Sequence, residues 1–310
     1  MRRRPLLPLA LLAVAALTSC ASSGSSDGAA TTAATTSTTA PRAEVTVPAD
    51  RPIDVHVPPS YRKGTPAPLL ILLHGFGASG DLQEGYLGLT TPADAAGMLY
   101  VHPDGTKNVI GKQFWNATDA CCAGPKAATE VDDSAYLDAV IAQVRSQYDV
   151  DPKRIFIVGH SNGGFMAYRM ACDHADEIAA IVSLEGATFD DPADCTPSEP
   201  VSTLEVHGRS DTTIFYDGGS IVGRTYPGAQ ETVETWATYD GCSTTPDDPA
   251  PAPRQIVNDL PPAAVVSYSD GCEPGGHAEL WDQPEGTHIP AWSATFSQQL
   301  IDWLQAHPKP

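Results

Sequence analysis

Short apolar runs alternate with amphipathic segments along most of this chain. The runs have the length and the β-branched or aromatic content of strands, and we predict strands at residues 53–57, 69–73, 98–102, 155–158, 179–184, 204–206, 265–268 and 278–282. Apolar residues at helical spacing predict helices around 137–144, directly after residue 161, and over 229–239 and 293–306. Strands that alternate with helices form βα units. We therefore predict an α/β fold with a mostly parallel central sheet of about eight strands, flanked by helices.

The first twenty residues have the pattern of an export signal. Three arginines at positions 2–4 precede an apolar run over residues 6–17, which is too short to span a bilayer. The run ends in Leu-Thr-Ser-Cys20, which is similar to the cleavage box of bacterial lipoproteins. We predict a signal peptide over 1–20 with lipid attachment at Cys20. An ordinary signal peptide cut near Ala21 is the alternative.

Composition divides the remainder of the chain into a linker and a folded domain. Residues 21–43 are mostly Ser, Thr, Ala and Gly, and such a segment buries too little apolar surface to offset its ordering entropy. We predict a flexible linker there. Residues 44–310 have an ordinary size for one α/β domain, and the apolar content of 42% is enough for one large core. The expected location is extracellular or at the cell surface, with the membrane contacted only through the lipid.

The charge of the chain limits its partners. There are 38 acidic residues against 18 Lys and Arg, which gives a formal net charge of -20. Nucleic acids and anionic membranes would be repelled, so we exclude both as partners. The charge says nothing about the oligomeric state, and it is typical of a soluble exported protein.

The cysteines also favour export. Of seven, one is Cys20, and the remaining even number in an oxidising compartment predicts disulfides. No Cys-x-x-Cys is present, so metal binding is the weaker interpretation. Many connectivities are allowed, and we favour the pairs Cys242–Cys272, Cys172–Cys195 and Cys121–Cys122.

The strand predicted at 155–158 runs directly into Gly159-His-Ser161-Asn-Gly163. A Gly-x-Ser-x-Gly pattern between a strand and a helix places the serine hydroxyl on a sharp turn, where a nucleophile is exposed. Glycines on both sides let the strand and the helix approach closely. The five-residue pattern alone also occurs by chance, but strand, turn and helix together predict that Ser161 is a nucleophile.

A serine nucleophile needs a histidine base and a carboxylate that orients the base. On α/β scaffolds of this kind the acid and then the histidine follow the serine, each in a loop after a strand. Asp211 follows the strand at 204–206 and a glycine turn, and we favour it over Asp217, which lies farther along the same loop. His288 lies in the loop after the last predicted strand. We favour it over His277, which lies at the entry to that strand.

Acyl transfer also needs donors for the oxyanion that develops on the substrate. The strand at 69–73 ends in His74-Gly75, the usual place for the first donor loop. We predict the backbone N–H groups of Phe76 and of Asn162 as the two donors. His160 lies within the turn itself, and we expect it to pack beside the nucleophile without carrying protons.

Together these segments resemble the secreted polyhydroxybutyrate depolymerase and feruloyl esterase family of α/β hydrolases. The likeness runs from about Val47 to the C-terminus, and its most specific part is Gly159-His-Ser-Asn-Gly-Gly-Phe-Met166. The other motifs that carry it are Leu-His-Gly, Val131-Asp-Asp133, Trp115-Asn-Ala-Thr-Asp-Ala-Cys-Cys122, His207-Gly-Arg-Ser-Asp211 and Gly286-Thr-His288. The resemblance implies an α/β-hydrolase fold and hydrolysis of carboxylic esters through an acyl-enzyme on Ser161, with no metal and no organic cofactor.

One segment departs from the family pattern. Many members carry a His-Thr-Trp-Pro-like sequence, whereas this chain has His288-Ile-Pro-Ala-Trp292. The base is kept, but the shifted tryptophan puts a direct transfer of acyl specificity in doubt. Trp115 and Trp292 are candidates for an aromatic clamp on a ring or a polymer, or for ordinary core residues.

The sequence therefore predicts an exported serine esterase of either a polyhydroxyalkanoate or a feruloylated or acetylated polysaccharide. It does not reveal which ester is cut or whether the ester is polymeric. An acyltransferase of the mycolyltransferase kind has the same fold and triad, and a peptidase uses the same chemistry on amides. A non-catalytic surface protein on a hydrolase scaffold is the remaining alternative.

Overall fold

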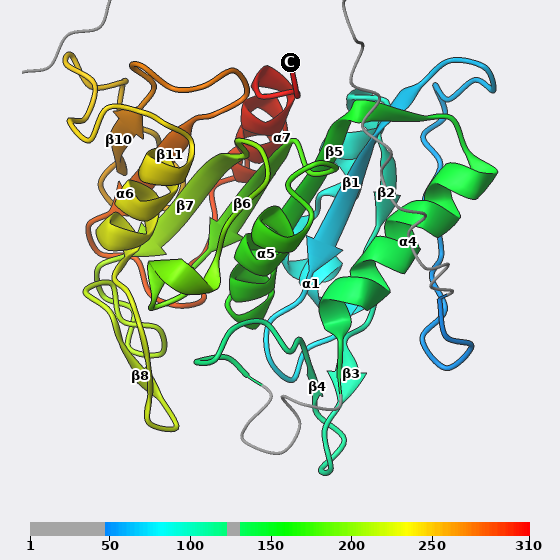
Figure 1. Ribbon diagram of the computed structural model, residues 1–310, viewed down its shortest axis with the longest axis horizontal. Helices are drawn as coiled ribbons and strands as arrows, with labels where there is room; N and C mark the ends of the chain where they lie inside the picture. Colours follow the sequence, from blue (N-terminus) through cyan, green and yellow to red (C-terminus); the bar gives the residue numbers. More distant parts are fainter. Residues whose placement is uncertain (1–46, 123–130) are drawn as a thin grey trace, which may run out of the picture. The chain divides into compact units, whose positions relative to one another are not determined.

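A seven-stranded sheet with helices on both faces forms the centre of the computed structural model (Figure 1). The structure describes residues 47–122 and 131–310. In spatial order its strands are β10 (Ala264–Tyr268), β11 (Ala278–Gln283), β7 (Ser202–Gly208), β6 (Ala180–Leu184), β5 (Val150–His160), β1 (Ala67–Leu73) and β2 (Leu99–Val101). Only β10 pairs antiparallel with its neighbour; the other pairs are parallel. The predicted α/β architecture is confirmed.

The predicted signal peptide over 1–20, the lipid attachment at Cys20 and the linker over 21–43 lie outside the described residues. No helix within 47–122 and 131–310 is long and apolar enough to cross a membrane.

One predicted strand is wrong. Residues 53–57 form only a single bridge, in which His56 and Tyr100 exchange backbone hydrogen bonds of 2.8 and 3.0 Å. Pro52 and Pro58 flank this segment, and proline has no N–H to donate to a ladder. The sheet consequently has seven strands rather than about eight.

Two short hairpins were not predicted. They pair β3 (Thr106–Lys107) with β4 (Gln113–Phe114), and β8 (Gly219–Ile221) with β9 (Arg224–Tyr226). Each follows a strand of the parallel sheet, β2 or β7, so both extend from its carboxyl edge (Figure 1). Their tips expose aliphatic side chains: Val109 and Ile110 on the first, and Val222 on the second.

Among the described residues, three helices cover each face of the sheet. One face carries α4 (Asp133–Gln147), α5 (Asn162–Asp173) and α6 (Ala229–Tyr239). The other carries α1 (Gly80–Leu87), α2 (Thr90–Ala95) and α7 (Phe296–Ala306). The side chain of Asp132 caps α4 by accepting from the Ala135 N–H, and carboxylates stabilise a helix at this end.

Strand β1 shows why these strands read as continuous apolar runs. Leu69, Ile71 and Leu73 enter the core on the face of α4 and α5, whereas Leu70 and Leu72 enter the opposite core on the face of α1, α2 and α7. All five side chains are fully buried. Each such burial stabilises the fold by about 1.5–3 kcal/mol, so the sheet is a rigid base for the loops at its carboxyl edge.

Three disulfides lie outside the sheet. The structure joins Cys242 to Cys272 beside α6, Cys172 at the end of α5 to Cys195, and Cys121 to Cys122. These are the three pairs favoured from the sequence.

Candidate active site

Ser161 occupies a tight turn between β5 and α5. Its φ of 54° lies in the left-handed region, which a non-glycine residue adopts only when its surroundings enforce it. Glycines supply that enforcement. A Cβ atom at Gly159 would lie 2.0 Å from the Gly163 carbonyl oxygen, and one at Gly163 would lie 2.2 Å from that of Leu73. Only glycine at both positions lets α5 press against β5 and β1 and hold the serine in this conformation.

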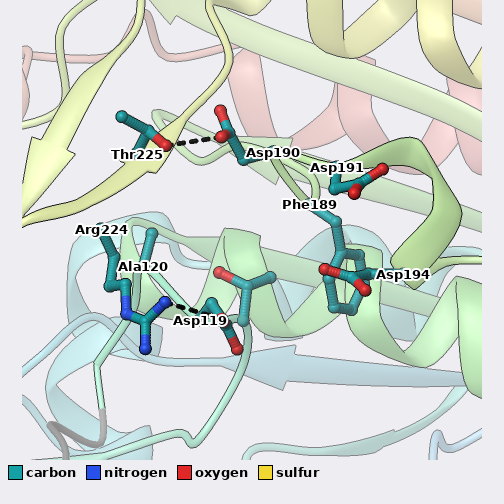
Figure 2. Close-up of a pocket in the computed structure, with 9 residues that line it drawn as sticks. Asp119, Ala120, Phe189, Asp190, Asp191, Asp194, Arg224 and Thr225 are labelled. Carbon is teal, nitrogen blue, oxygen red and sulfur yellow. Dashed lines mark hydrogen bonds and ion pairs between the residues drawn. The ribbon is translucent and has the colours of Figure 1, made fainter.

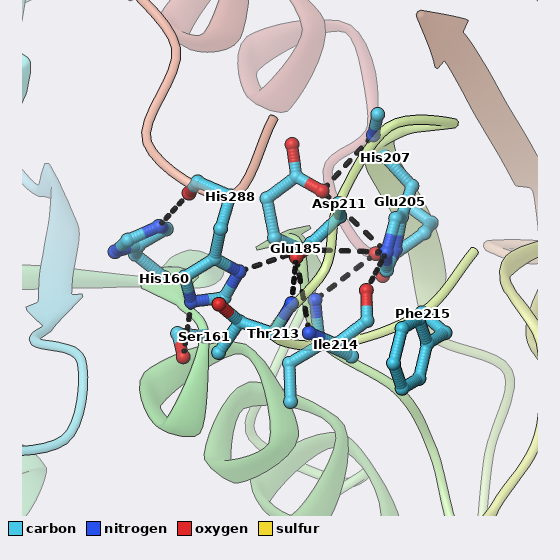
Figure 3. Close-up of polar contacts among 12 residues, drawn as sticks. His160, Ser161, Glu185, Glu205, His207, Asp211, Thr213, Ile214, Phe215 and His288 are labelled. Atoms are coloured by element: carbon cyan, nitrogen blue, oxygen red, sulfur yellow. Dashed lines mark hydrogen bonds and ion pairs between the residues drawn. The ribbon is translucent and has the colours of Figure 1, made fainter. Parts of the chain in front are cut away.

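The predicted base and acid meet Ser161 at the carboxyl edge of the sheet (Figure 3). His288 Nε2 lies 2.9 Å from Ser161 Oγ, and His288 Nδ1 lies 2.7 Å from Asp211 Oδ2. The second oxygen of Asp211 accepts from the backbone N–H groups of Thr213 (2.7 Å) and Ile214 (3.0 Å). Burial alone would raise the pKa of Asp211, but the hydrogen bonds from His288 and Thr213 outweigh it and lower that pKa. The carboxylate is therefore ionised and fixed in orientation.

The loops that carry the acid and the base contact each other through two glycines. A Cβ atom at Gly208 would lie 2.2 Å from the carbonyl oxygen of Gly286, so the two backbones touch. The N–H of Ser210 donates to the same carbonyl at 2.9 Å. Because Gly208 ends β7 and Gly286 follows β11, this contact fixes the separation of Asp211 and His288.

The competing residues lie elsewhere. His277 precedes β11, at the opposite edge of the sheet from His288, and its Nε2 lies 3.2 Å from Glu279 Oε2. Asp217 lies in a turn closed by a hydrogen bond from Gly218 N–H to the Phe215 carbonyl. The structure thus brings Asp211 and His288 to Ser161, and it does not bring His277 there.

The predicted donor loop lies against the nucleophile. A Cβ atom at Gly75 would be 3.5 Å from Ser161 Cβ. The loop is held by His74, whose Nε2 accepts from Gly105 N–H at 2.9 Å and whose Nδ1 therefore donates to the Gly75 carbonyl at 2.8 Å. Burial lowers the pKa of His74, which keeps this ring neutral. Among the described residues, no acceptor takes a hydrogen bond from the backbone N–H of Phe76.

The residue after the nucleophile is fixed through its side chain. Asn162 Oδ1 accepts from Trp115 N–H at 2.7 Å, and Asn162 Nδ2 donates to the Trp115 carbonyl at 2.8 Å and contacts Cys121 Sγ at 3.4 Å. Its backbone N–H begins α5 and has no acceptor within 47–122 and 131–310. Two N–H groups with no acceptor in the described part of the chain thus adjoin the nucleophile: that of Phe76 follows Gly75, and that of Asn162 follows Ser161 itself.

His160 holds the backbone of the base. Burial, and then the charge that His288 can carry, lower the pKa of His160 to about 4, so its ring is neutral at neutral pH. The ring donates from Nε2 to the His288 carbonyl at 2.9 Å. On its other side the ring faces Tyr86 at 5.7 Å between centroids, and Tyr86 Oη donates to the Pro290 carbonyl at 2.8 Å. Both contacts restrain the loop that carries His288.

The suggested aromatic clamp is wrong for Trp115. This side chain has no exposed surface, and its indole N–H donates to the His74 carbonyl at 3.0 Å, so it supports the donor loop from inside the core. Trp292 is half-buried and stacks on Phe296 at 3.9 Å between centroids. It lines a pocket of about 520 Å³ together with Tyr86 and Pro290. The two tryptophans contact different cores of the sheet.

A smaller pocket of about 150 Å³ has a lining that does not include Ser161 (Figure 2). Asp119, Asp190 and Arg224 line it, and Arg224 Nη1 lies 3.6 Å from Asp119 Oδ2. Asp190 Oδ2 accepts from Thr225 Oγ1 at 2.5 Å. The pocket contains neither serine nor histidine, so we assign no acyl chemistry to it.

Sequence reasoning missed a buried acidic cluster directly behind the acid. His207 Nδ1 lies 2.9 Å from Glu205 Oε1, and His207 Nε2 lies 3.0 Å from the Ile214 carbonyl and 3.4 Å from Glu185 Oε2. Burial alone would lower the pKa of His207, but the adjacent carboxylates raise it to about 9. Burial raises the pKa of Glu185 to about 8. Charged residues within or directly after buried strands were the signal that could have revealed this cluster.

The same cluster is the metal-binding candidate of the described part of the chain. Glu185, His207 and Asp211 place one potential ligand atom each within 4.8 Å of one another. In this structure both nitrogens of His207 and both oxygens of Asp211 already have protein hydrogen-bond partners. A cation would have to displace those partners, including the triad histidine, so the arrangement fits a hydrogen-bonded network.

A comparison with protein families shows which family the chain belongs to. The model of the family described as "Putative esterase" matches residues 45–258, more than half of the chain. The chain belongs to this esterase family. The match includes Ser161 and Asp211 and ends before His288.

Two curated relatives of this esterase family member carry similar names. The chain is 32% identical over 152 residues to a protein from Nocardia uniformis named putative esterase NocK, which covers 49% of this chain and 42% of the relative. It is 29% identical over 240 residues to feruloyl esterase B from Piromyces equi, which covers 74% of this chain and 43% of the relative. The chain spans less than half the length of both.

Solved structures show the same fold. An acetyl xylan esterase from Aspergillus awamori superposes with a TM-score of 0.56 at 14% identity, covering 82% of this chain and 93% of the other. At this identity the likeness establishes the α/β-hydrolase fold alone.

Proposed function

We propose that this protein is an exported serine esterase that hydrolyses carboxylic esters through Ser161, His288 and Asp211. The observation that carries the proposal is the continuous hydrogen-bonded chain from Ser161 Oγ through both ring nitrogens of His288 to an ionised Asp211. It lies next to two unpaired backbone N–H groups and within an esterase family fold. A nucleophile, a base with an orienting carboxylate and two donors for the oxyanion are the groups that acyl transfer from an ester to water requires, and this arrangement supports the proposal.

The geometry supports a two-step reaction. His288 Nε2 accepts the hydroxyl proton as Ser161 Oγ attacks the ester carbonyl, and the imidazolium that forms is stabilised by Asp211. The N–H groups of Phe76 and Asn162 hold the oxyanion, and loss of one such donor typically costs on the order of 10²–10³ in kcat. His288 then gives its proton to the departing alkoxide. Water attacks the acyl-enzyme with His288 as base, which releases the acid and restores Ser161.

The surroundings of the serine support an ester with an apolar or aromatic portion. Phe76, Phe215 and Ile289 each follow closely on a proposed catalytic segment, and each exposes half or more of its side chain. Feruloyl and acetyl esters of polysaccharides fit the names of the relatives, and polyhydroxyalkanoates fit the resemblance in the sequence. Export is supported by the predicted signal peptide and by the three disulfides. Lipid attachment at Cys20 stays a prediction.

A substrate panel tests the proposal. Wild-type protein and Ser161→Ala are assayed on a p-nitrophenyl ester, methyl ferulate, acetylated xylan and polyhydroxybutyrate, and both are treated with a fluorophosphonate probe. We expect wild-type protein to be labelled and to hydrolyse at least one ester, and Ser161→Ala to do neither while keeping its fold. Turnover by Ser161→Ala would place the nucleophile elsewhere. Transfer to an added acceptor alcohol in excess of hydrolysis would make the protein an acyltransferase.

A further inference from the structure

We propose that Glu185 is a positioning residue for the triad acid: from the end of β6 its carboxyl group holds the turn that carries Asp211. The proposal rests on the proposed function, because it assigns a role within the same site. Glu185 follows β6 directly, and β6 lies between β5 and β7, which carry Ser161 and Asp211. The residue has no contact with Ser161 in the chain of hydrogen bonds described above, so its effect passes through Asp211.

Glu185 reaches the acid by two routes. Its Oε2 accepts from Gly208 N–H at 2.9 Å, and Gly208 is the first residue of the turn that ends in Asp211. The same oxygen lies 3.4 Å from His207 Nε2, which in turn lies 3.8 Å from Asp211 Oδ2. Gly208 is also the point at which this turn touches Gly286 in the loop of the base. A single carboxyl group therefore contacts the junction that sets the distance between acid and base.

The backbone of Glu185 indicates that its placement is enforced. Its φ is 54°, a left-handed conformation that costs a non-glycine residue on the order of 1–3 kcal/mol. Its side chain is only 1% exposed. Glycine would relieve the backbone, and a smaller or apolar residue would avoid the burial of a carboxyl group. The carboxyl group is thus kept at this position although the left-handed backbone and the burial of the carboxyl group both cost free energy.

The groups around Glu185 indicate that the carboxyl acts in its neutral form. It faces His207 and Glu205 on β7, Asp211 in the following turn and, at longer range, Tyr86 on α1. Burial raises the pKa of Glu185 to about 8, and the two neighbouring carboxylates add to the effect of burial while His207 opposes it. This shift favours the protonated carboxyl of Glu185 near neutral pH, whereas the hydrogen bonds to Asp211 keep that carboxylate ionised against His288. Glutamine should replace Glu185 in this role.

The test compares three variants on the ester that the wild-type protein cuts best. Glu185→Met keeps the volume but removes the acceptor, and Glu185→Gln keeps an acceptor without a charge. Asp240→Asn is the matched control: Asp240 is also fully buried, burial raises its pKa to about 8, and it accepts from Val201 N–H and His277 N–H. Those two residues precede β7 and β11, so Asp240 lies at the opposite edge of the sheet from the serine.

We expect Glu185→Met to lose about 10²-fold in kcat with KM within about 3-fold, because a displaced acid mainly affects the transition state. The acidic limb of its pH profile should also move to lower pH, since a misplaced Asp211 stabilises the imidazolium less. Glu185→Gln should keep kcat within about 3-fold at pH 7, and Asp240→Asn should change the melting temperature without changing kcat or the profile.

Three results would overturn the inference: wild-type kcat in Glu185→Met, equal losses in Glu185→Met and Glu185→Gln, or an equal loss in Asp240→Asn. If Glu185→Met does not fold, Glu185→Gln decides alone, and a loss of more than about 10-fold at pH 7 contradicts a neutral positioning role. An inactive wild-type protein would instead contradict the proposed function itself. Activity that Ser161→Ala abolishes and the Glu185 variants leave intact would contradict only this inference.

Discussion

Substitution of Gly208 by alanine tests whether the contact between the acid and base loops sets the activity. The new Cβ would lie 2.2 Å from the carbonyl oxygen and 2.3 Å from the carbonyl carbon of Gly286. Ordinary carbon contacts are about 3.5–4.0 Å, so one of the two backbones must shift by at least ~1 Å. A displacement of that size between catalytic groups costs about 10²-fold in rate, and overpacking of this kind costs about 1–3 kcal/mol of stability. We therefore expect both losses together.

The assay is steady-state hydrolysis of a p-nitrophenyl ester, combined with titration of active serines and thermal unfolding. Gly85→Ala is the matched control, because Gly85 lies exposed on α1 and a Cβ there meets nothing within 4 Å. Alanine in a helix interior should stabilise that variant by about 0.5–1 kcal/mol and leave kcat unchanged. If Gly208→Ala folds and keeps wild-type kcat, the loops tolerate the shift and the argument from backbone contact is refuted.

Three further outcomes are expected. His288→Ala should abolish ester turnover while His277→Ala stays near wild type, and the reverse ranking in the same kinetic assay would exchange the two assignments. Burial lowers the pKa of His160 in the folded protein to about 4, whereas a histidine in the unfolded chain has a pKa of about 6.5. The buried neutral ring therefore contributes fully to the unfolding free energy above about pH 6.5, and that contribution is lost as the pH falls from about 6.5 through 4. His160→Phe should flatten the fall in unfolding free energy over that range by on the order of 3 kcal/mol, and an unchanged slope in denaturant titrations would speak against a buried neutral ring. Replacement of both Cys172 and Cys195 by alanine should lower the unfolding free energy by about 2–4 kcal/mol with kcat retained, and denaturant midpoints that match wild type would count against this bridge.

The architecture was predictable because buried parallel strands must be apolar on both faces. Strand β1 is the clearest case, since its alternate residues enter two different cores and the whole segment therefore reads as one apolar run. The segment 53–57, Ile-Asp-Val-His-Val, alternates apolar and polar residues as an edge strand can, but its flanking prolines restrict it to a single bridge. Two-residue strands such as β3 and β4 are too short for any periodicity to reveal.

The candidate active site also has features that the local sequence reveals and features that depend on contacts between distant segments. The order of Ser161, Asp211 and His288 along the chain follows from strand ends at one edge of a sheet, and it is readable from the sequence. The burial of Trp115 is not, because an aromatic residue in a loop has the same sequence signal whether it faces the substrate or the core. The role of Glu185 depends on a backbone conformation and on a contact with the next strand, and neither leaves a local pattern.

The glycine contacts divide the backbone at the carboxyl edge into two kinds of segment. Around Ser161 and between Gly208 and Gly286 there is no space for even one methyl group, so these segments tolerate almost no change. The hairpins β3–β4 and β8–β9 end in exposed tips at Ile110 and Val222, which no core restrains. Exchange of the side chains at those tips leaves both cores of the sheet untouched. Along a lineage with this scaffold, sequence change should therefore collect at the two hairpin tips, while the glycines around the proposed nucleophile and at the contact between the loops are kept.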